Sequence, residues 1–168
     1  MLVVTDKILM ELGLPQNLLN ALEDNNVKYT VFDDVQPNPT IENVESGREL
    51  YKKNKCDGII GFGGGSPMDC AKIIGARISN PYFSVRRMKG LFRVILPIPP
   101  LFCVPTTAGT GSETTGVAIF DLVEMHAKTG IAHRFLKPAL GIIDPDNTRH
   151  LPPAVAACTG LDVLSHAS

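Results

Sequence analysis

Apolar segments of strand length alternate with helix-forming segments along most of the chain. The strand candidates are residues 2–5, 27–32, 58–62 and 101–104. The helix candidates between them are residues 14–25, 42–53 and 66–78. This alternation predicts an α/β fold with a doubly wound, mostly parallel sheet, in which ligands bind at the carboxyl ends of the strands.

The pattern is less regular after residue 80. Residues 80–100 contain several prolines and basic side chains and are predicted to form an exposed loop. The later strand candidates are 116–120, 130–132 and 140–143. A polar turn that contains Lys128 is expected between the first two of them. Residues 151–168 are predicted to be helical in two parts, separated at Gly160.

Composition narrows the class of protein. A chain of 168 residues is about one domain. The formal net charge of −1 argues against a polyanionic partner such as nucleic acid. No apolar run approaches the roughly 18 residues of a membrane helix, and no signal peptide is visible. The four cysteines form no CxxC pair and are typical of reduced thiols, so we expect a cytoplasmic protein.

A run of three glycines, Gly63 to Gly65, follows the strand candidate 58–62 and precedes a helix candidate. Ser66 is expected to cap that helix, and Pro67 suits its first position. Glycines at such a turn let the backbone approach a ligand, and the free N–H groups and the helix dipole favour a phosphate. The alternative is a tight turn that needs glycine only for its positive φ angles.

Three further features admit both a functional and a structural interpretation. Residues 105–115 are rich in hydroxyls and either face a ligand or form a solvated loop. Asp6 follows the first strand candidate and either accepts a hydrogen bond from a ribose hydroxyl or caps a helix. Asp162 and His166 are four residues apart on one helix face, and they either bind a divalent metal or form an exposed pair.

Five sequence blocks, in order along the chain, together resemble the signature blocks of the iron-containing (group III) alcohol dehydrogenases. They are VTDK at 4–7, PNPT at 37–40, GGGSPMD at 63–69, PTTAGTGSE at 105–113 and GLDVLSHA at 160–167. The resemblance extends over essentially the whole chain. It implies that residues 1–147 form an NAD-binding α/β domain and that residues 148–168 begin an all-helical metal-binding domain.

The resemblance also implies an activity and a set of site residues. The implied enzyme is a metal-dependent, NAD-linked alcohol dehydrogenase that transfers hydride between nicotinamide and an alcohol or an aldehyde. Asp162 and His166 would be the first two ligands of an Fe2+ ion, or of Zn2+, and Asp6 would favour NAD over NADP. The residues implied to bind NAD are Asp6, Asn38, Gly64, Gly65, Ser66, Asp69, Thr106, Thr107, Thr110, Ser112 and Lys128.

Three shorter blocks resemble one branch of this family, the hydroxyacid–oxoacid transhydrogenases, whose members keep their nicotinamide bound. These blocks are GVAIFD at 116–121, KP at 137–138 and IDP at 143–145. The family's opening strand and helix are missing before Met1, and its two further histidine ligands would lie beyond Ser168, so we expect a fragment. We expect a homo-oligomer when full length, and a mitochondrial location if a missing N-terminus carries a transit peptide. A non-catalytic nucleotide-binding module is the alternative function, and no catalytic residue is assigned.

Overall fold

The computed structural model describes residues 1–122, 127–149 and 151–167, with the backbone alone for residues 127, 166 and 167. A five-stranded sheet with the strand order β2-β1-β3-β5-β8 forms its centre, and every strand pair in it is parallel. Its strands are β1 (Leu2–Val4), β2 (Thr30–Phe32), β3 (Ile59–Gly63), β5 (Leu101–Pro105) and β8 (Leu140–Gly141). This order confirms the predicted α/β fold with a doubly wound sheet.

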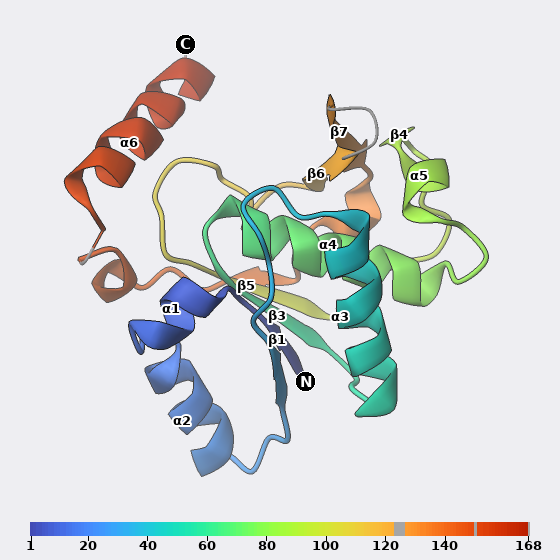
Figure 1. The fold of residues 1–168 in the computed structure, drawn as a ribbon, viewed down its shortest axis with the longest axis horizontal. Coiled ribbons are helices and arrows are strands. Elements are labelled where there is room, and N and C mark those ends of the chain that lie inside the picture. Colours follow the sequence, from blue (N-terminus) through green and yellow to red (C-terminus); the bar gives the residue numbers. More distant parts are fainter. Residues whose placement is uncertain (123–126, 150, 168) are drawn as a thin grey trace.

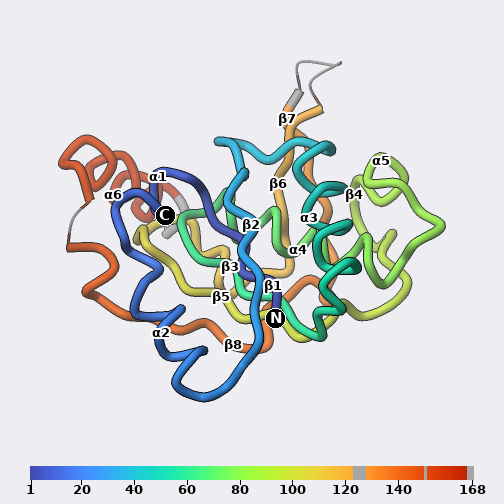
Figure 2. The backbone as a smooth tube through the Cα atoms, turned by 60° about the horizontal axis from the view of Figure 1, so that its bottom comes forward, coloured from blue at the N-terminus to red at the C-terminus, as the bar shows by residue number. Residues whose placement is uncertain are grey.

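Helices cover both faces of this sheet (Figures 1 and 2). They are α1 (Lys7–Glu11), α2 (Gln16–Asp24), α3 (Ile41–Lys53) and α4 (Gly65–Ser79). Alternate side chains of a strand point to opposite faces. Val3 therefore packs with Leu19 of α2 on one side, whereas Leu2 and Val4 join the side chains of α3 and α4 on the other. Two apolar cores result, one on each side of the sheet.

A second sheet of three strands packs against α4. Its strand order is β4-β7-β6, with β4 (Gly90–Leu91), β6 (Val117–Leu122) and β7 (Ala127–Ala132). The short helices α5 (Val85–Met88), η2 (Arg134–Leu136) and η3 (Pro145–Thr148) lie in the connections. Because β6 and β7 are antiparallel neighbours with Lys128 opposite Asp121, Lys128 lies inside a strand and not in the predicted turn.

Two helices differ from the sequence-based prediction. The bounds of α1 were not predicted, and only the possible cap at Asp6 pointed to it, because five residues are too few to show a helical period. Helix α6 (Pro153–Ala167) continues through Gly160, where two parts were predicted. A glycine inside a helix costs only about 1 kcal/mol relative to alanine. The alanine and leucine residues around Gly160 favour the helix and outweigh this cost. In Figure 1, α6 lies at the edge of the molecule. Within the described ranges, no helix has both the length and the apolar character needed to cross a membrane.

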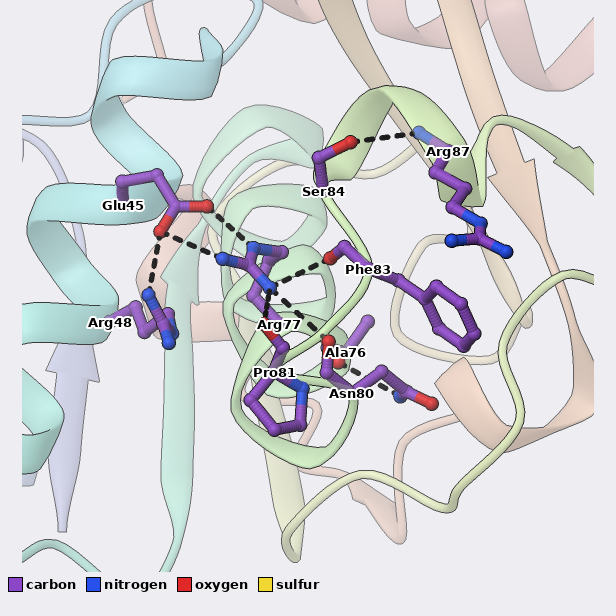
Figure 3. A network of polar contacts seen from close by, with 9 residues as sticks. All are labelled: Glu45, Arg48, Ala76, Arg77, Asn80, Pro81, Phe83, Ser84 and Arg87. Atoms are coloured by element: carbon purple, nitrogen blue, oxygen red, sulfur yellow. Dashed lines mark hydrogen bonds and ion pairs between the residues drawn. The ribbon is translucent and has the colours of Figure 1, made fainter.

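A buried arginine at the end of α4 joins three segments (Figure 3). The Arg77 side chain is 9% exposed, and its guanidinium contacts both carboxylate oxygens of Glu45 on α3. Its Nη1 atom donates to the carbonyl oxygens of Asn80, Pro81 and Phe83, at 3.2, 3.2 and 2.7 Å. These bonds fix the path of the chain where it leaves α4.

Replacing Glu45 by Gln should lower the free energy of unfolding by about 1–2 kcal/mol at neutral pH, because the buried Arg77 would lose its counter-charge. Burial alone would raise the pKa of Glu45, but the guanidiniums of Arg77 and Arg48 outweigh burial and hold that pKa below its ordinary value. The stabilisation is therefore present above the pKa of a free glutamate, about 4.3. It is lost as the pH falls through the lower pKa of the folded state.

Urea unfolding at a series of pH values between about 3 and 7 measures this difference. Glu49→Gln, at an exposed position of the same helix, is the matched control and should behave like the wild type throughout. If the difference in unfolding free energy between Glu45→Gln and the wild type stayed the same down to the lowest pH of the series, it would contradict the role given to the Glu45 charge.

Candidate functional site

The candidate site lies at the carboxyl ends of the central parallel strands. The strand order changes direction between β1 and β3, and open α/β sheets bind ligands outside such a switch point. Asp6 follows β1, Gly64 follows β3 and Thr106 follows β5. The Thr106 N–H donates to the Gly63 carbonyl oxygen at 2.9 Å, which joins two of these strand ends.

The glycine turn starts α4 earlier than predicted. Gly63 has a φ of +145°, and a Cβ there would lie 2.7 Å from Pro67 Cγ, so this position requires glycine. Gly64 is then the N-cap, and no side chain forms a cap hydrogen bond there. Ser66 is the second helical residue, and its Oγ accepts from the Asn38 N–H at 3.2 Å. The predicted N-cap role of Ser66 is therefore wrong, because Gly63 turns the chain in time for Gly64 to take that place.

The first turn of α4 has the properties of an anion site. Without a side-chain cap, its N–H groups stay available at the positive end of a 15-residue helix. The hydroxyl-rich loop (residues 106–115) lies directly against this turn. A Cβ on Gly64 would be 3.4 Å from Thr107 Oγ1, and a Cβ on Gly65 would be 3.2 Å from Thr110 Cγ2. Any side chain at either glycine would therefore fill the space between the turn and the loop.

Two buried hydroxyls near the strand ends lack a partner. Thr107 Oγ1, in the hydroxyl-rich loop, and Thr5 Oγ1, directly after β1, have no hydrogen bond within the described part of the chain. Buried hydroxyls are nearly always paired in native proteins. The polar atoms at the glycine turn and the hydroxyl-rich loop therefore fit a polar, anionic ligand such as a dinucleotide.

Asp6 caps the short helix that follows β1. Its Oδ1 accepts from the Leu9 N–H at 2.9 Å, which confirms the helix-cap interpretation. The next residue, Lys7, forms an exposed ion pair with Asp34 at 2.8 Å. A carboxylate has two oxygens and the cap uses Oδ1, so capping does not prevent Asp6 from also accepting a ribose hydroxyl.

Asp69 and Ser112 hydrogen-bond to each other. Ser112 Oγ lies 2.6 Å from Asp69 Oδ1, and the Ile119 N–H donates to Asp69 Oδ2 at 2.9 Å. Lys72 Nζ donates to Ser112 Oγ at 2.8 Å and lies 3.5 Å from Asp69 Oδ1. Sequence reasoning missed Lys72. Its signal was a lysine within an apolar helical segment, three residues after an aspartate, which is a spacing at which opposite charges on a helix can pair.

The contacts of Lys72 indicate that it is an ammonium. Burial lowers the pKa of Lys72 against the opposing effect of Asp69, and burial raises the pKa of Asp69 against the opposing effect of Lys72. However, Lys72 Nζ has three acceptors: Ser112 Oγ, Thr115 Oγ1 and Val117 O, at 2.8, 3.4 and 2.7 Å. Val117 O can only accept, and Ser112 Oγ gives its single proton to Asp69, so both need an N–H of Lys72. Because the Asp69 carboxylate also lies 3.5 Å from Nζ, we assign an ion pair.

The remaining predicted residues lie on other elements. Lys128 is exposed on β7. Asp162 and His166 both lie on α6, where Asp162 is half-buried and the His166 side chain is outside the described residues. Helix α6 approaches the hydroxyl-rich loop at Gly109, where a Cβ would lie 2.6 Å from Thr159 O. Across the described residues, no group of three histidine, cysteine or acidic side chains could hold a metal ion.

Comparison with known proteins assigns the family. Residues 1–145 match the family model described as iron-containing alcohol dehydrogenase, and this chain belongs to that family. It is 45% identical over 170 residues to the mitochondrial hydroxyacid-oxoacid transhydrogenase of Xenopus tropicalis, which covers 98% of this chain and 36% of that protein. The chain thus spans little more than a third of the length of this relative.

Solved structures agree with this assignment. The structure of a 1,3-propanediol oxidoreductase matches with a TM-score of 0.94 and 36% identity, over 99% of this chain and 43% of that one. The sulfoacetaldehyde reductase of Bifidobacterium kashiwanohense, solved in complex with NAD+, matches with a TM-score of 0.84 and 34% identity, over 99% and 44% of the two chains.

Proposed function

We propose that this chain is the NAD-binding part of a metal-dependent alcohol dehydrogenase that transfers hydride between nicotinamide and an alcohol or carbonyl carbon. The observation that carries the proposal is the uncapped first turn of α4, which lies against the unpartnered hydroxyl of Thr107 at the switch point of the sheet. The NAD+ complex of the related sulfoacetaldehyde reductase supports NAD as the ligand.

In this proposal, residues 1–147 bind NAD and residues 148–168 begin a helical metal-binding domain. The N–H groups at the start of α4 hold the pyrophosphate, and Asp6 accepts a ribose hydroxyl while it caps α1. The other residues proposed to line the cofactor are Asn38, Ser66, Thr106, Thr107, Thr110 and Lys128. The hydroxyl-rich loop shields the phosphates from water on the side opposite the helix.

Asp162 and His166 are the proposed ligands that this chain contributes to an Fe2+ or Zn2+ ion. When bound, such an ion acts as a Lewis acid toward the substrate oxygen. Two ligands do not complete a site, and the described residues supply no cluster of three. We therefore propose that the remaining ligands lie in the region that the relatives have in addition to this chain.

The identity to the Xenopus tropicalis enzyme favours a hydroxy acid and an oxo acid as substrates. The likeness to the 1,3-propanediol oxidoreductase favours a simple alcohol and its aldehyde as the alternative. A nucleotide-binding module without catalysis is the second alternative. The names of the curated relatives favour a mitochondrial location over the cytoplasm. We also propose a homo-oligomer for the full-length protein.

Titration of NADH and NADPH into the purified chain by calorimetry tests the cofactor proposal. NADH should bind more tightly than NADPH, because the Asp6 carboxylate repels a 2′-phosphate. Asp6→Asn keeps an oxygen that can cap α1 and removes the charge, so it should narrow the difference between the two Kd values. A chain that unfolds cooperatively but binds neither nucleotide would overturn the proposal.

The same preparation distinguishes the substrate alternatives. A transhydrogenase keeps its nicotinamide bound, so nucleotide released from the purified protein by denaturation would favour the hydroxy acid and oxo acid pair. A chain that purifies without nucleotide and binds NADH reversibly would favour an ordinary dehydrogenase or the non-catalytic module.

A further inference from the structure

Lys72 is completely buried, and its contacts reach well beyond its own helix. Its side chain is 0% exposed and lies on α4, two turns after the glycine turn. The three acceptors of its ammonium all belong to residues 112–117, which are the end of the hydroxyl-rich loop and the first residue of β6. One charge on α4 therefore holds the whole end of that loop.

Asp69 holds the same connection one turn earlier. It accepts from Ser112 Oγ at 2.6 Å and from the Ile119 N–H at 2.9 Å. Asp69 and Lys72 thus fix the connection between the loop and β6 to the helix whose first turn forms the anion site. The other end of the loop is fixed to β3 by the bond from the Thr106 N–H to Gly63 O.

The single proton of the Ser112 hydroxyl is engaged in this arrangement. The hydroxyl donates this proton to Asp69 and accepts from Lys72, and the residue is 5% exposed. A hydroxyl in this state has no proton left for a cofactor phosphate. Ser112 is therefore better placed to hold the loop than to contact a ligand, which differs from the role that the family resemblance implies.

We propose that Lys72 is a positioning residue for the candidate cofactor site: through Ser112 it holds the hydroxyl-rich loop against the glycine turn before the ligand binds. The loop contributes Thr107 and Thr110 at the glycine turn, so its order in the free protein determines how much of the site is preformed. A preformed loop loses less conformational entropy on binding, which strengthens affinity without any new contact. The part of this inference that concerns NAD rests on the proposed function.

Hydrogen–deuterium exchange of the free protein tests the positioning role directly. Ser112→Ala removes the hydroxyl through which Lys72 and Asp69 hold the loop, while the bonds of Lys72 to Thr115 Oγ1 and Val117 O remain. This variant should raise the exchange rates of the amides in residues 106–115 by about tenfold, the equivalent of one hydrogen bond to a charged group. Arg77→Met is the matched control, because Arg77 is also a buried cation on α4 and holds a different segment through three backbone carbonyls. Arg77→Met should raise the exchange rates of the amides around residues 80–83 and leave those of the hydroxyl-rich loop unchanged.

NADH affinity supplies the second measurement. Ser112→Ala should weaken NADH binding by about tenfold, and the loop should regain its wild-type protection once NADH is bound, because the ligand then orders it. Weaker affinity with an unchanged loop in the free protein would mean a direct contact to the cofactor and would overturn the inference. Unchanged loop exchange and unchanged affinity would overturn it as well.

The two proposals can fail separately. If the wild type binds no NADH, the proposed function fails, while the exchange rates of the free protein still report whether Lys72 and Ser112 hold the loop. If the wild type binds NADH and the loop of Ser112→Ala exchanges like that of the wild type, the positioning role fails alone.

Discussion

A Gly65→Val variant is expected to lose NADH affinity by at least about 100-fold, equivalent to nearly 3 kcal/mol, and to keep a cooperative unfolding transition. Gly65 is the first residue of α4 and does not have a positive φ, so its backbone conformation is open to valine. The new side chain would start 3.2 Å from Thr110 Cγ2 and occupy the space between the glycine turn and the hydroxyl-rich loop. A bound pyrophosphate needs that space and the N–H groups behind it.

Calorimetric titration with NADH, together with thermal unfolding of the same samples, measures both parts of this expectation. Gly160→Val is the matched control, because a side chain at Gly160 of α6 would meet open space. It should bind NADH like the wild type. If Gly65→Val binds NADH with the affinity of the control, the pyrophosphate does not lie at the start of α4.

Lys72→Met should lower the free energy of unfolding by about 3–5 kcal/mol, the usual cost of removing one partner of a buried ion pair. Methionine fills most of the same volume, so the loss would come mainly from the Asp69 carboxylate, whose side chain is 13% exposed, and from Val117 O and Ser112 Oγ, which would lose their donor. Urea unfolding monitored by circular dichroism gives the number.

A double variant separates charge from packing. Lys72→Met combined with Asp69→Asn removes both charges, and the asparagine oxygen can still accept one of the bonds from Ser112 Oγ and the Ile119 N–H. It should recover about half or more of the stability lost in Lys72→Met, because replacing both partners of a buried ion pair usually costs much less than removing one of them. Equal losses in the single and double variants would show that the carboxylate charge is not the source of the cost.

The parts of the site that sequence reasoning predicted are those encoded locally. The strands before Gly63 and Thr106 each form a continuous apolar run, so the positions of the glycine turn and the hydroxyl-rich loop followed from the pattern alone. Asp6 was correctly expected as a cap candidate, because an acidic residue after a strand is a local signal.

The errors concern interactions between distant segments. Whether Ser66 or Gly64 caps α4 depends on the φ angle of Gly63 and on Asn38, which is 28 residues away from Ser66. The acceptors of Lys72 lie 40 to 45 residues along the chain, so no local pattern could identify them. In the same way, the position of Lys128 in β7 depends on its pairing with β6 and not on its polar neighbours.

One helix carries the candidate anion site, the buried Lys72 and the distal Arg77, and this arrangement constrains its length. At 1.5 Å per residue, Lys72 lies about 10 Å and Arg77 about 18 Å along α4 from Gly65. Inserting or deleting one residue within α4 would rotate every later side chain by about 100° and separate each anchor from its partners. Length differences between homologous chains should therefore fall in connections such as residues 80–100, while the spacing within α4 stays constant.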